Sequence, residues 1–234
     1  MKKYLPLGIL IILALTLNGC VSNCITGSGN KITQERNVSK FNSVSFSGSG
    51  NVNIIQDGTT RLKLSGDDNI LDKVETYVQD DVLYIKPKQC VSGNIDAYVN
   101  MDTIRSINLS GSGNIIGSTK IVSDDLSLKI SGSGKIMAGL EAKKLEITTT
   151  GSGESTLIGT ADDYTYDSSG SGKFFAYNLI TKRGKIRITG SGTAETTAQE
   201  TLDVTISGSG TVYYKGNATV NQNVSGSGSV KKTG

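Results

Sequence analysis

Adjacent aspartates are the residues of this sequence best suited to metal binding or acid–base chemistry. They form four pairs, Asp67-Asp68, Asp80-Asp81, Asp124-Asp125 and Asp162-Asp163. Carboxylates that converge in one patch bind calcium, or cleave polysaccharides in enzymes built on β-helices. The last two pairs lie at different offsets within the repeat described below, and the turn between them offers only Glu141, so the pairs do not converge. Aspartate also favours tight turns without a ligand, and we expect turn residues here, with no metal and no cofactor.

Composition argues against several classes of function. The 234-residue chain has no histidine, which removes the commonest general base, the serine–histidine and cysteine–histidine nucleophiles, and histidine-ligated zinc. Without Lys2 and Lys3 of the leader, 22 basic residues stand against 21 acidic ones. A near-neutral chain offers no clustered basic surface for nucleic acid. We therefore expect a protein that is not an enzyme and that has no nucleic-acid partner.

The N-terminus has the pattern of a lipoprotein signal peptide, over residues 1–19. Two lysines precede an apolar run from Leu5 to Leu17 that is short for a transmembrane helix. The run ends at Leu17-Asn18-Gly19-Cys20, which resembles the lipobox of bacterial lipoproteins. That resemblance implies cleavage before Cys20, lipid on this cysteine and anchoring in a membrane. Because Val21 is not the aspartate associated with inner-membrane retention, we expect an outer-membrane lipoprotein, periplasmic or surface-exposed. An ordinary secretory signal is the alternative.

Two further cysteines could form a disulfide. Residues 20–26 make a short tether, and Cys24 in it could pair with Cys90 in an oxidising envelope. The sequence does not decide whether these two residues meet.

A repeat of about twenty residues dominates the chain. Gly-Ser-Gly begins at residues 27, 48, 111, 132, 151, 170, 190, 208 and 226, and weaker copies at Ser65-Gly66-Asp67 and Ser92-Gly93-Asn94 occupy the long gap after Gly48. Apolar residues keep the same parity as both glycines, as at Leu128, Ile130 and Ile136. A flexible linker has no reason to hold that phase. We expect one all-β domain over residues 27–234, a right-handed parallel β-helix of about ten turns of 18–21 residues.

Residues at the alternate positions are small and polar, and they would face outward. This face is the candidate binding surface, together with an outward tyrosine: Ser49, Asn51, Ser112, Asn114, Ser133, Ser152, Ser171, Ser191, Ser209 and Tyr213. A regular line of hydroxyls could lie along a long polymer such as a glycan, or on a protein. The alternative is a solvated ladder with no ligand.

One excursion interrupts the repeat near the end of the first third. Two alternating segments within residues 73–88 flank Asp80-Asp81, which predicts a hairpin with a tight turn. Such an excursion could carry function, or could cover an edge of the sheet.

The segments Asn37 to Gly58 and Ser65 to Leu71, with the recurring Gly113-Asn114-Ile115 pattern, resemble a known bacterial family. This is the "putative auto-transporter adhesin, head GIN domain" family, and the resemblance covers about Phe41 to Val230. It implies an envelope protein with a β-helical body and supplies no catalytic residues.

The leading hypothesis is a lipid-anchored, non-catalytic adhesion or ligand-binding module. A polysaccharide-active β-helix enzyme is the second hypothesis. A structural module that stacks end to end through open strand edges is the third. Lys231 and Lys232 near the C-terminus argue against end-to-end stacking, because lysine on an edge strand blocks pairing. We expect a monomer.

Overall fold

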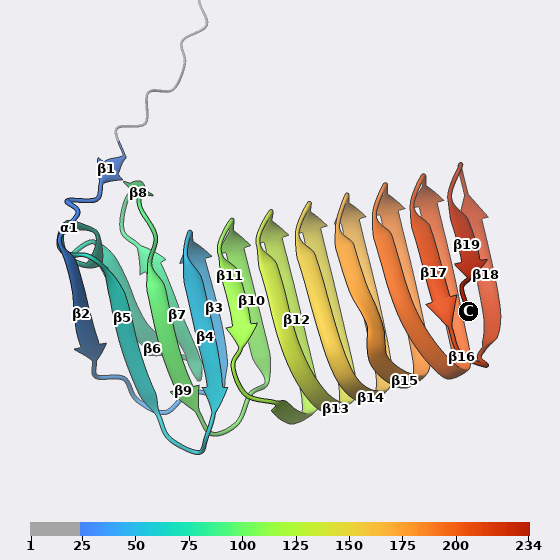
Figure 1. The fold of residues 1–234 in the computed structure, drawn as a ribbon, viewed down its shortest axis with the longest axis horizontal. Coiled ribbons are helices and arrows are strands. Elements are labelled where there is room, and N and C mark those ends of the chain that lie inside the picture. The colour runs from blue at the N-terminus through green and yellow to red at the C-terminus, as the bar shows by residue number, and fades with distance from the viewer. Residues whose placement is uncertain (1–23) are drawn as a thin grey trace, which may run out of the picture.

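The protein is a rod of stacked strands (Figure 1). A computed structural model describes residues 24–234, so the predicted leader and Cys20 lie outside the described residues. Its elements are β1 (Ile25–Thr26), β2 (Lys31–Arg36), β3 (Ser43–Gly48), β4 (Asn51–Gln56), β5 (Arg61–Asp67), α1 (Asp68–Leu71), β6 (Val74–Gln79), β7 (Val82–Pro87), β8 (Val91–Ser92), β9 (Asp96–Met101), β10 (Ser106–Gly111), β11 (Asn114–Gly117), β12 (Ile121–Gly132), β13 (Lys135–Gly151), β14 (Glu154–Gly170), β15 (Lys173–Gly190), β16 (Thr193–Gly208), β17 (Thr211–Lys215), β18 (Thr219–Ser225) and β19 (Ser229–Lys232).

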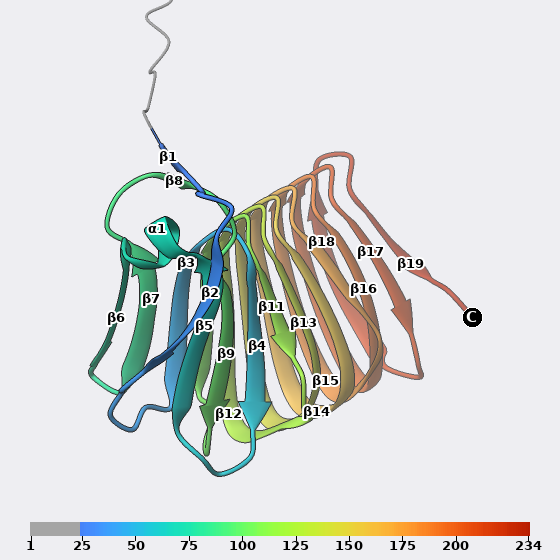
Figure 2. The same cartoon turned by 60° about the vertical axis from the view of Figure 1, so that its left-hand side comes forward.

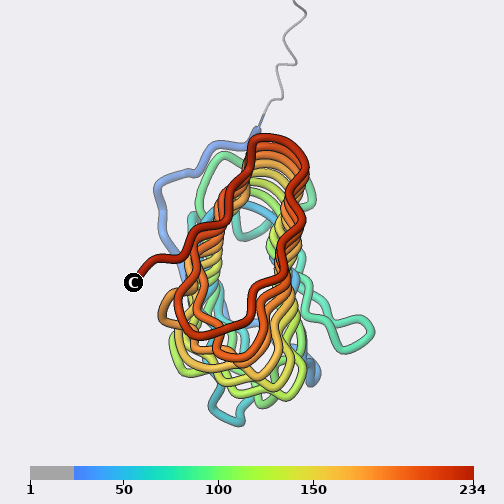
Figure 3. The backbone as a smooth tube through the Cα atoms, turned by 90° about the vertical axis from the view of Figure 1, so that its right-hand side faces the viewer, coloured from blue at the N-terminus to red at the C-terminus, as the bar shows by residue number. Residues whose placement is uncertain are grey.

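Successive turns pair in parallel and in register, which confirms the predicted β-solenoid. Each turn has one wall that leads into a Gly-Ser-Gly corner and a second wall that follows it. In the pairing of β12 with β13 and of β13 with β14, the first glycines of three corners, Gly132, Gly151 and Gly170, lie opposite one another. The two walls enclose the interior, as the view along the axis shows (Figure 3).

The core consists of columns of inward side chains, one from each turn. The column at the centre of the wall before the corner is buried throughout: Val44, Ile107, Leu128, Ile147, Tyr166, Ile186 and Val204. Inward side chains every second residue are what the alternation in the sequence predicted.

The number of turns is smaller than the sequence indicated. Strand β10 pairs directly with β3, so that Gly111 lies opposite Gly48 and the residues between them insert no turn into the stack. Eight corners, from Gly48 to Gly226, leave about seven turns where ten were expected. The weaker copies at Gly66 and Gly93 each have one glycine where the corner needs two, and they lie in strands that pair antiparallel or in a loop.

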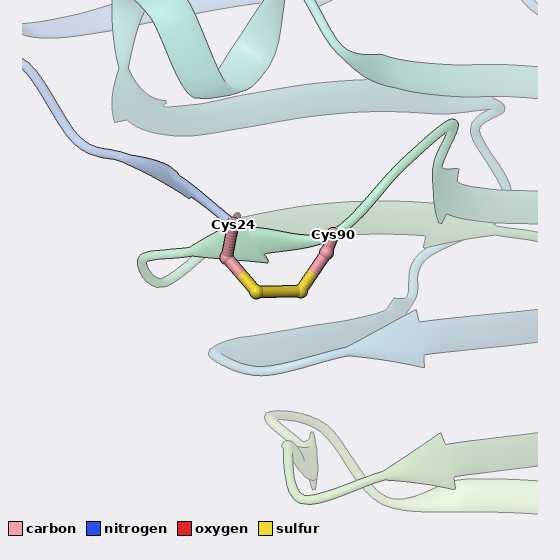
Figure 4. The surroundings of a disulfide bond; sticks show 2 residues. All are labelled: Cys24 and Cys90. Atoms are coloured by element: carbon pink, nitrogen blue, oxygen red, sulfur yellow. A yellow bond between two sulfur atoms is a disulfide. The ribbon is translucent and has the colours of Figure 1, made fainter. Parts of the chain in front are cut away.

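The residues of the long gap close the N-terminal end of the rod. Strand β7 continues the wall of β3 and β9 continues the wall of β4, both in parallel. Beyond β9, strands β5 and β2 add to the sheet antiparallel (Figure 2). A disulfide between Cys24 and Cys90 joins the start of the described chain to this end, beside the short β1–β8 pair (Figure 4).

The predicted hairpin within residues 73–88 is confirmed. Strands β6 and β7 pair antiparallel around Asp80 and Asp81, whose φ angles of 51° and 59° are left-handed. Two such residues define a type I′ turn, which aspartate tolerates. Because β7 also pairs with β3, the hairpin is part of the wall and covers its edge.

Each corner requires glycine for two different reasons. The first glycine has a left-handed backbone, with φ of 119° at Gly132. The second approaches the turn beneath it so closely that a Cβ on Gly134 would lie 2.5 Å from the carbonyl oxygen of Gly113. No L side chain fits either position without moving the backbone.

We predict that Gly132→Ala lowers the free energy of unfolding by about 2 kcal/mol or more, measured by urea denaturation. The added methyl group would both strain the left-handed backbone and lie 2.6 Å from the carbonyl oxygen of Gly111. The matched control is Ser133→Ala on the same corner, where a change within about 0.5 kcal/mol is expected. A Gly132→Ala protein as stable as this control would contradict the account of the corner.

Candidate functional site

The serines in the middle of the corners form a straight line along one edge of the rod. All eight of these serines are exposed, Ser227 of the last corner included. The seven that belong to the predicted surface we call the serine edge: Ser49, Ser112, Ser133, Ser152, Ser171, Ser191 and Ser209. Neighbouring members are about 4.8 Å apart, the spacing of adjacent strands. The structure therefore brings together the serines of the predicted surface.

Hydrogen bonds hold the backbone of the serine edge and leave its hydroxyl groups free. The amide of Ser133 donates to the carbonyl oxygen of Gly111 at 3.0 Å, and the amide of Ser152 donates to that of Gly132 at 2.9 Å. Within residues 24–234, none of the seven hydroxyl groups has a protein partner. The edge is a rigid row of unused donors and acceptors.

The other predicted surface residues lie beside this edge with their side chains partly engaged. Asn114 donates from Nδ2 to Oδ1 of Asn51 at 3.0 Å, and Asn51 donates from Nδ2 to Asp96 at 2.9 Å. These half-buried amides form a ladder that ties the first turns to the N-terminal end. Tyr213 lies near the other end, half-buried, with the ammonium group of Lys231 5.9 Å from its ring centre.

The outer face of the wall after the corner carries apolar side chains of which the sequence predicted only Tyr213. One column of this face runs along the axis as Ile116, Met137, Thr156, Phe175, Glu195, Tyr213 and Lys231. Beside it, Ile158 is 50% exposed. We call these residues the apolar wall. Its signal in the sequence is two consecutive apolar residues, as at Ile136-Met137 and Phe174-Phe175, which breaks the alternation.

The outer face of the wall before the corner lacks such an apolar column. Its outward side chains are polar or charged in every turn of its central column: Ser45, Asn108, Lys129, Thr148, Asp167, Arg187, Thr205 and Asn223. The two outer faces of the rod are therefore chemically distinct, and the serine edge separates them.

Two hollows adjoin these features. A shallow, mostly apolar hollow of about 420 Å³ lies over Gly139, which faces Ile158 of the next turn. A larger hollow of about 620 Å³ lies where the chain enters the regular stack, with Arg105, Asp125 and Lys144 on its sides. The second hollow has charges of both signs and no column of apolar side chains.

The aspartate pairs at the bend opposite the serine edge take part in ion pairs. Lys143 lies 2.9 Å from Asp124, and Lys182 lies 2.8 Å from Asp162. In the adjacent column Asp125, Lys144, Asp163 and Arg183 follow one another in register. Basic residues of the intervening turn, Lys143 and Lys144, thus separate the two aspartate pairs.

The remaining two pairs lie at the N-terminal end. Asp80 and Asp81 form the hairpin turn, while Asp68 accepts hydrogen bonds from Ser28 and Asn30 at 2.5 and 2.8 Å. These bonds, that from Ser28 first, lower the pKa of the Asp68 carboxyl group. Within residues 24–234 no three Asp, Glu, Cys or His side chains form a group that could hold a metal ion.

Ion pairing shifts the pKa values of this bend in the expected directions. Arg183 donates two hydrogen bonds to Asp163, at 2.6 and 2.8 Å, and these bonds lower the pKa of that carboxyl group below its ordinary 3.8. The hydrogen bonds to Asp124 and Asp162 raise the pKa values of the ammonium groups of Lys143 and Lys182. A carboxylate whose pKa is lowered by folding stabilises the fold above its unfolded pKa and loses that effect in acid.

We predict that Asp163→Asn lowers the free energy of unfolding by about 0.5–1 kcal/mol at pH 7, because the pair is mostly solvent-exposed. The difference from the unmodified protein should shrink as the pH falls below about 4, where the carboxyl group becomes protonated. Urea titrations between pH 7 and pH 2 measure both values. Asp102→Asn, which removes an exposed carboxylate that makes no ion pair within residues 24–234, is the control and should show no such difference. A constant difference across this pH range would contradict the assignment.

The part of the chain that the structure describes has no helix that is long and apolar enough to cross a membrane. Fold and surface together define a parallel β-solenoid with one closed end and one line of free hydroxyls.

Comparison with known proteins identifies the family. The chain belongs to the family described as "Putative auto-transporter adhesin, head GIN domain", whose model matches residues 40–218. A "putative adhesin" from Bacteroides fragilis is 27% identical, with a TM-score of 0.83, over 89% of this chain and 100% of the other. A "putative lipid binding protein" from Parabacteroides distasonis is also 27% identical, with a TM-score of 0.74, over 90% and 99% of the two chains. A "putative adhesin" from Parabacteroides merdae is 25% identical, with a TM-score of 0.72 over the same shares. No curated protein matches the chain.

The family and the fold agree with the prediction made from Asn37 to Gly58 and the Gly-Ser-Gly repeat. Family and neighbours carry the names of adhesins or of a lipid-binding protein.

Proposed function

We propose that this protein is a non-catalytic adhesion module that holds an extended polymer, a glycan by preference, along the serine edge and the adjoining apolar wall. The observation that carries the proposal is the row of seven exposed serine hydroxyls with no protein partner, one per turn. A ligand that repeats along its length can meet the same group at each step.

The apolar wall supplies the second requirement of glycan binding. Sugar rings present C–H groups on their faces and hydroxyl groups on their edges. Aromatic and aliphatic side chains pack against the faces, and Phe175 and Tyr213 lie two turns apart in one column with Glu195 between them. Glu195 and the serine edge provide acceptors and donors for the hydroxyl groups.

We further propose that lipid on Cys20 anchors this module in the outer membrane. The Leu17-to-Cys20 sequence supports the anchor. Three residues lie between Cys20 and the disulfide at Cys24, so the closed end of the rod would stay close to its membrane.

Lipid binding is the second candidate function. The hollow over Gly139, with Leu140 and the exposed Ile158 on its sides, is apolar enough to take part of an acyl chain. One structural neighbour has a lipid-binding name. The hollow is shallow and does not follow the repeat, so we rank this function second.

A glycan array probed with the full chain, purified from membranes in mild detergent, tests the first proposal. We expect binding to one class of linear polysaccharide. The triple variant Ser133→Glu, Ser152→Glu and Ser171→Glu should weaken that binding at least about tenfold, because it places three like charges along the ligand path.

The matched control is Thr160→Glu, Asn178→Glu and Gln199→Glu, which adds the same charge at exposed positions of the opposite bend. This variant should bind like the unmodified chain. No binding to any glycan, or equal loss in both variants, would refute the serine edge as the glycan surface. Binding of fatty acid that is lost in Ile158→Glu alone would favour the second candidate.

A further inference from the structure

The two ends of the rod differ in whether other segments of the described chain cover them. At the N-terminal end, antiparallel strands, α1 and the disulfide cover the first turn. At the C-terminal end no segment of residues 24–234 covers the last turn (Figure 3). Within residues 24–234, β18 pairs with β16 on one side, and no strand pairs with its other edge.

Only one of the two open edges is protected. Strand β19 ends in Lys231 and Lys232, which keep another strand from pairing there. Strand β18 has no charged residue and no proline between Thr219 and Ser225. Lys231 and Lys232, which argued against end-to-end stacking from the sequence alone, therefore block pairing only at β19. They do not block pairing at β18.

The inward face of β18 also leaves the core unfinished. Val220, Gln222 and Val224 lie over the buried Leu202, Val204 and Ile206 of the turn before. Val224 is 37% exposed although it continues a core column. Gln222 follows Val204 at the end of the apolar column that contains Val44. An amide therefore lies where each earlier turn has an aliphatic side chain, or the ring of Tyr166.

The sequence of β18 is nearly palindromic about Gln222. It reads Thr-Val-Asn-Gln-Asn-Val-Ser from residue 219 to residue 225. An antiparallel pair of two identical strands centred on this residue would place Val220 opposite Val224 and Asn221 opposite Asn223. Thr219 would then face Ser225, and the two Gln222 amides would meet on the axis. Each residue would thus face one of its own kind, which suits cross-strand pairing.

We propose that β18 is the contact surface of a tail-to-tail dimer, in which two copies of this chain pair their β18 strands antiparallel about a two-fold axis through Gln222. A two-fold contact of this kind uses the same patch on both subunits. The dimer covers the exposed valines with valines, satisfies the Gln222 amides with each other and removes the unprotected edge at the C-terminal end. It leaves the serine edge and apolar wall uncovered and does not depend on the proposed ligand.

Cysteine cross-linking of the full chain in its own membrane tests both the contact and its register. In Gln222→Cys the two new cysteines are directly opposite, with Cα atoms about 4.5–5.5 Å apart, within the range of a disulfide. Mild oxidation should convert most of this variant to a covalent dimer on a non-reducing gel. In Thr219→Cys the two new cysteines are six residues apart, about 20 Å, and should give no dimer above the unmodified chain.

The proposed register also predicts which pair of different variants should cross-link. Thr219→Cys and Ser225→Cys, each unable to dimerise alone, should form a mixed dimer when the two variants are expressed together. Adding Asn223→Lys to Gln222→Cys should abolish the cross-link, because lysine on an edge strand blocks pairing. The two new charges would also lie diagonally across the contact, each opposite Asn221 of the other copy.

Three results would overturn the proposal. The first is a Gln222→Cys protein whose thiol reacts with maleimide but forms no dimer. The second is equal dimer from Thr219→Cys alone, which indicates random collision or another register. The third is a cross-link to a different protein, which would show that β18 receives a strand from another partner.

Discussion

Parallel, in-register stacking is the constraint on which the rest of this structure depends. It places each residue about 4.8 Å from its equivalents in the turns above and below. Each residue must therefore be compatible with the residue at the same position of the turns above and below it. The glycine corners satisfy this condition through backbone hydrogen bonds, as between the Ser133 amide and the Gly111 carbonyl oxygen. The charged bend satisfies it through alternation of sign, as in the column Asp125, Lys144, Asp163 and Arg183.

The same constraint explains which parts of the fold were predictable. The wall positions could be read from the sequence because inward residues such as Leu128 and Ile147 repeat at a fixed phase with the glycines. The turn count could not, because the gap of 63 residues between Gly48 and Gly111 has the length of three turns by coincidence. Whether Gly66 and Gly93 form corners is decided by the strands that pair there, and β5 pairs antiparallel with β9. Long-range pairing of this kind leaves no local signal.

The candidate site divides in the same way. The serine edge follows from the repeat and was predicted residue by residue, from Ser49 to Ser209. The apolar wall was missed apart from Tyr213, because Met137 and Phe175 lie at the parity that was assumed to be polar. The ion pairs of Asp124 and Asp163 were missed because their partners are on neighbouring turns, not near in sequence. Inside the rod, Thr149, Ser155 and Ser168 are buried at inward positions, where the parity of the glycines places them although their side chains are polar.

The claim that the corner after β3 stacks directly on the corner after β10 can be tested by one distance. Spin labels on Ser49→Cys and Ser209→Cys report the number of turns between them, since both positions are exposed on the serine edge. Six steps of 4.8 Å predict a separation of about 29 Å by pulsed electron paramagnetic resonance. If the gap between Gly48 and Gly111 contained three steps, the separation would be about 38 Å. The shorter distance is the result this structure predicts, and the longer one would contradict it.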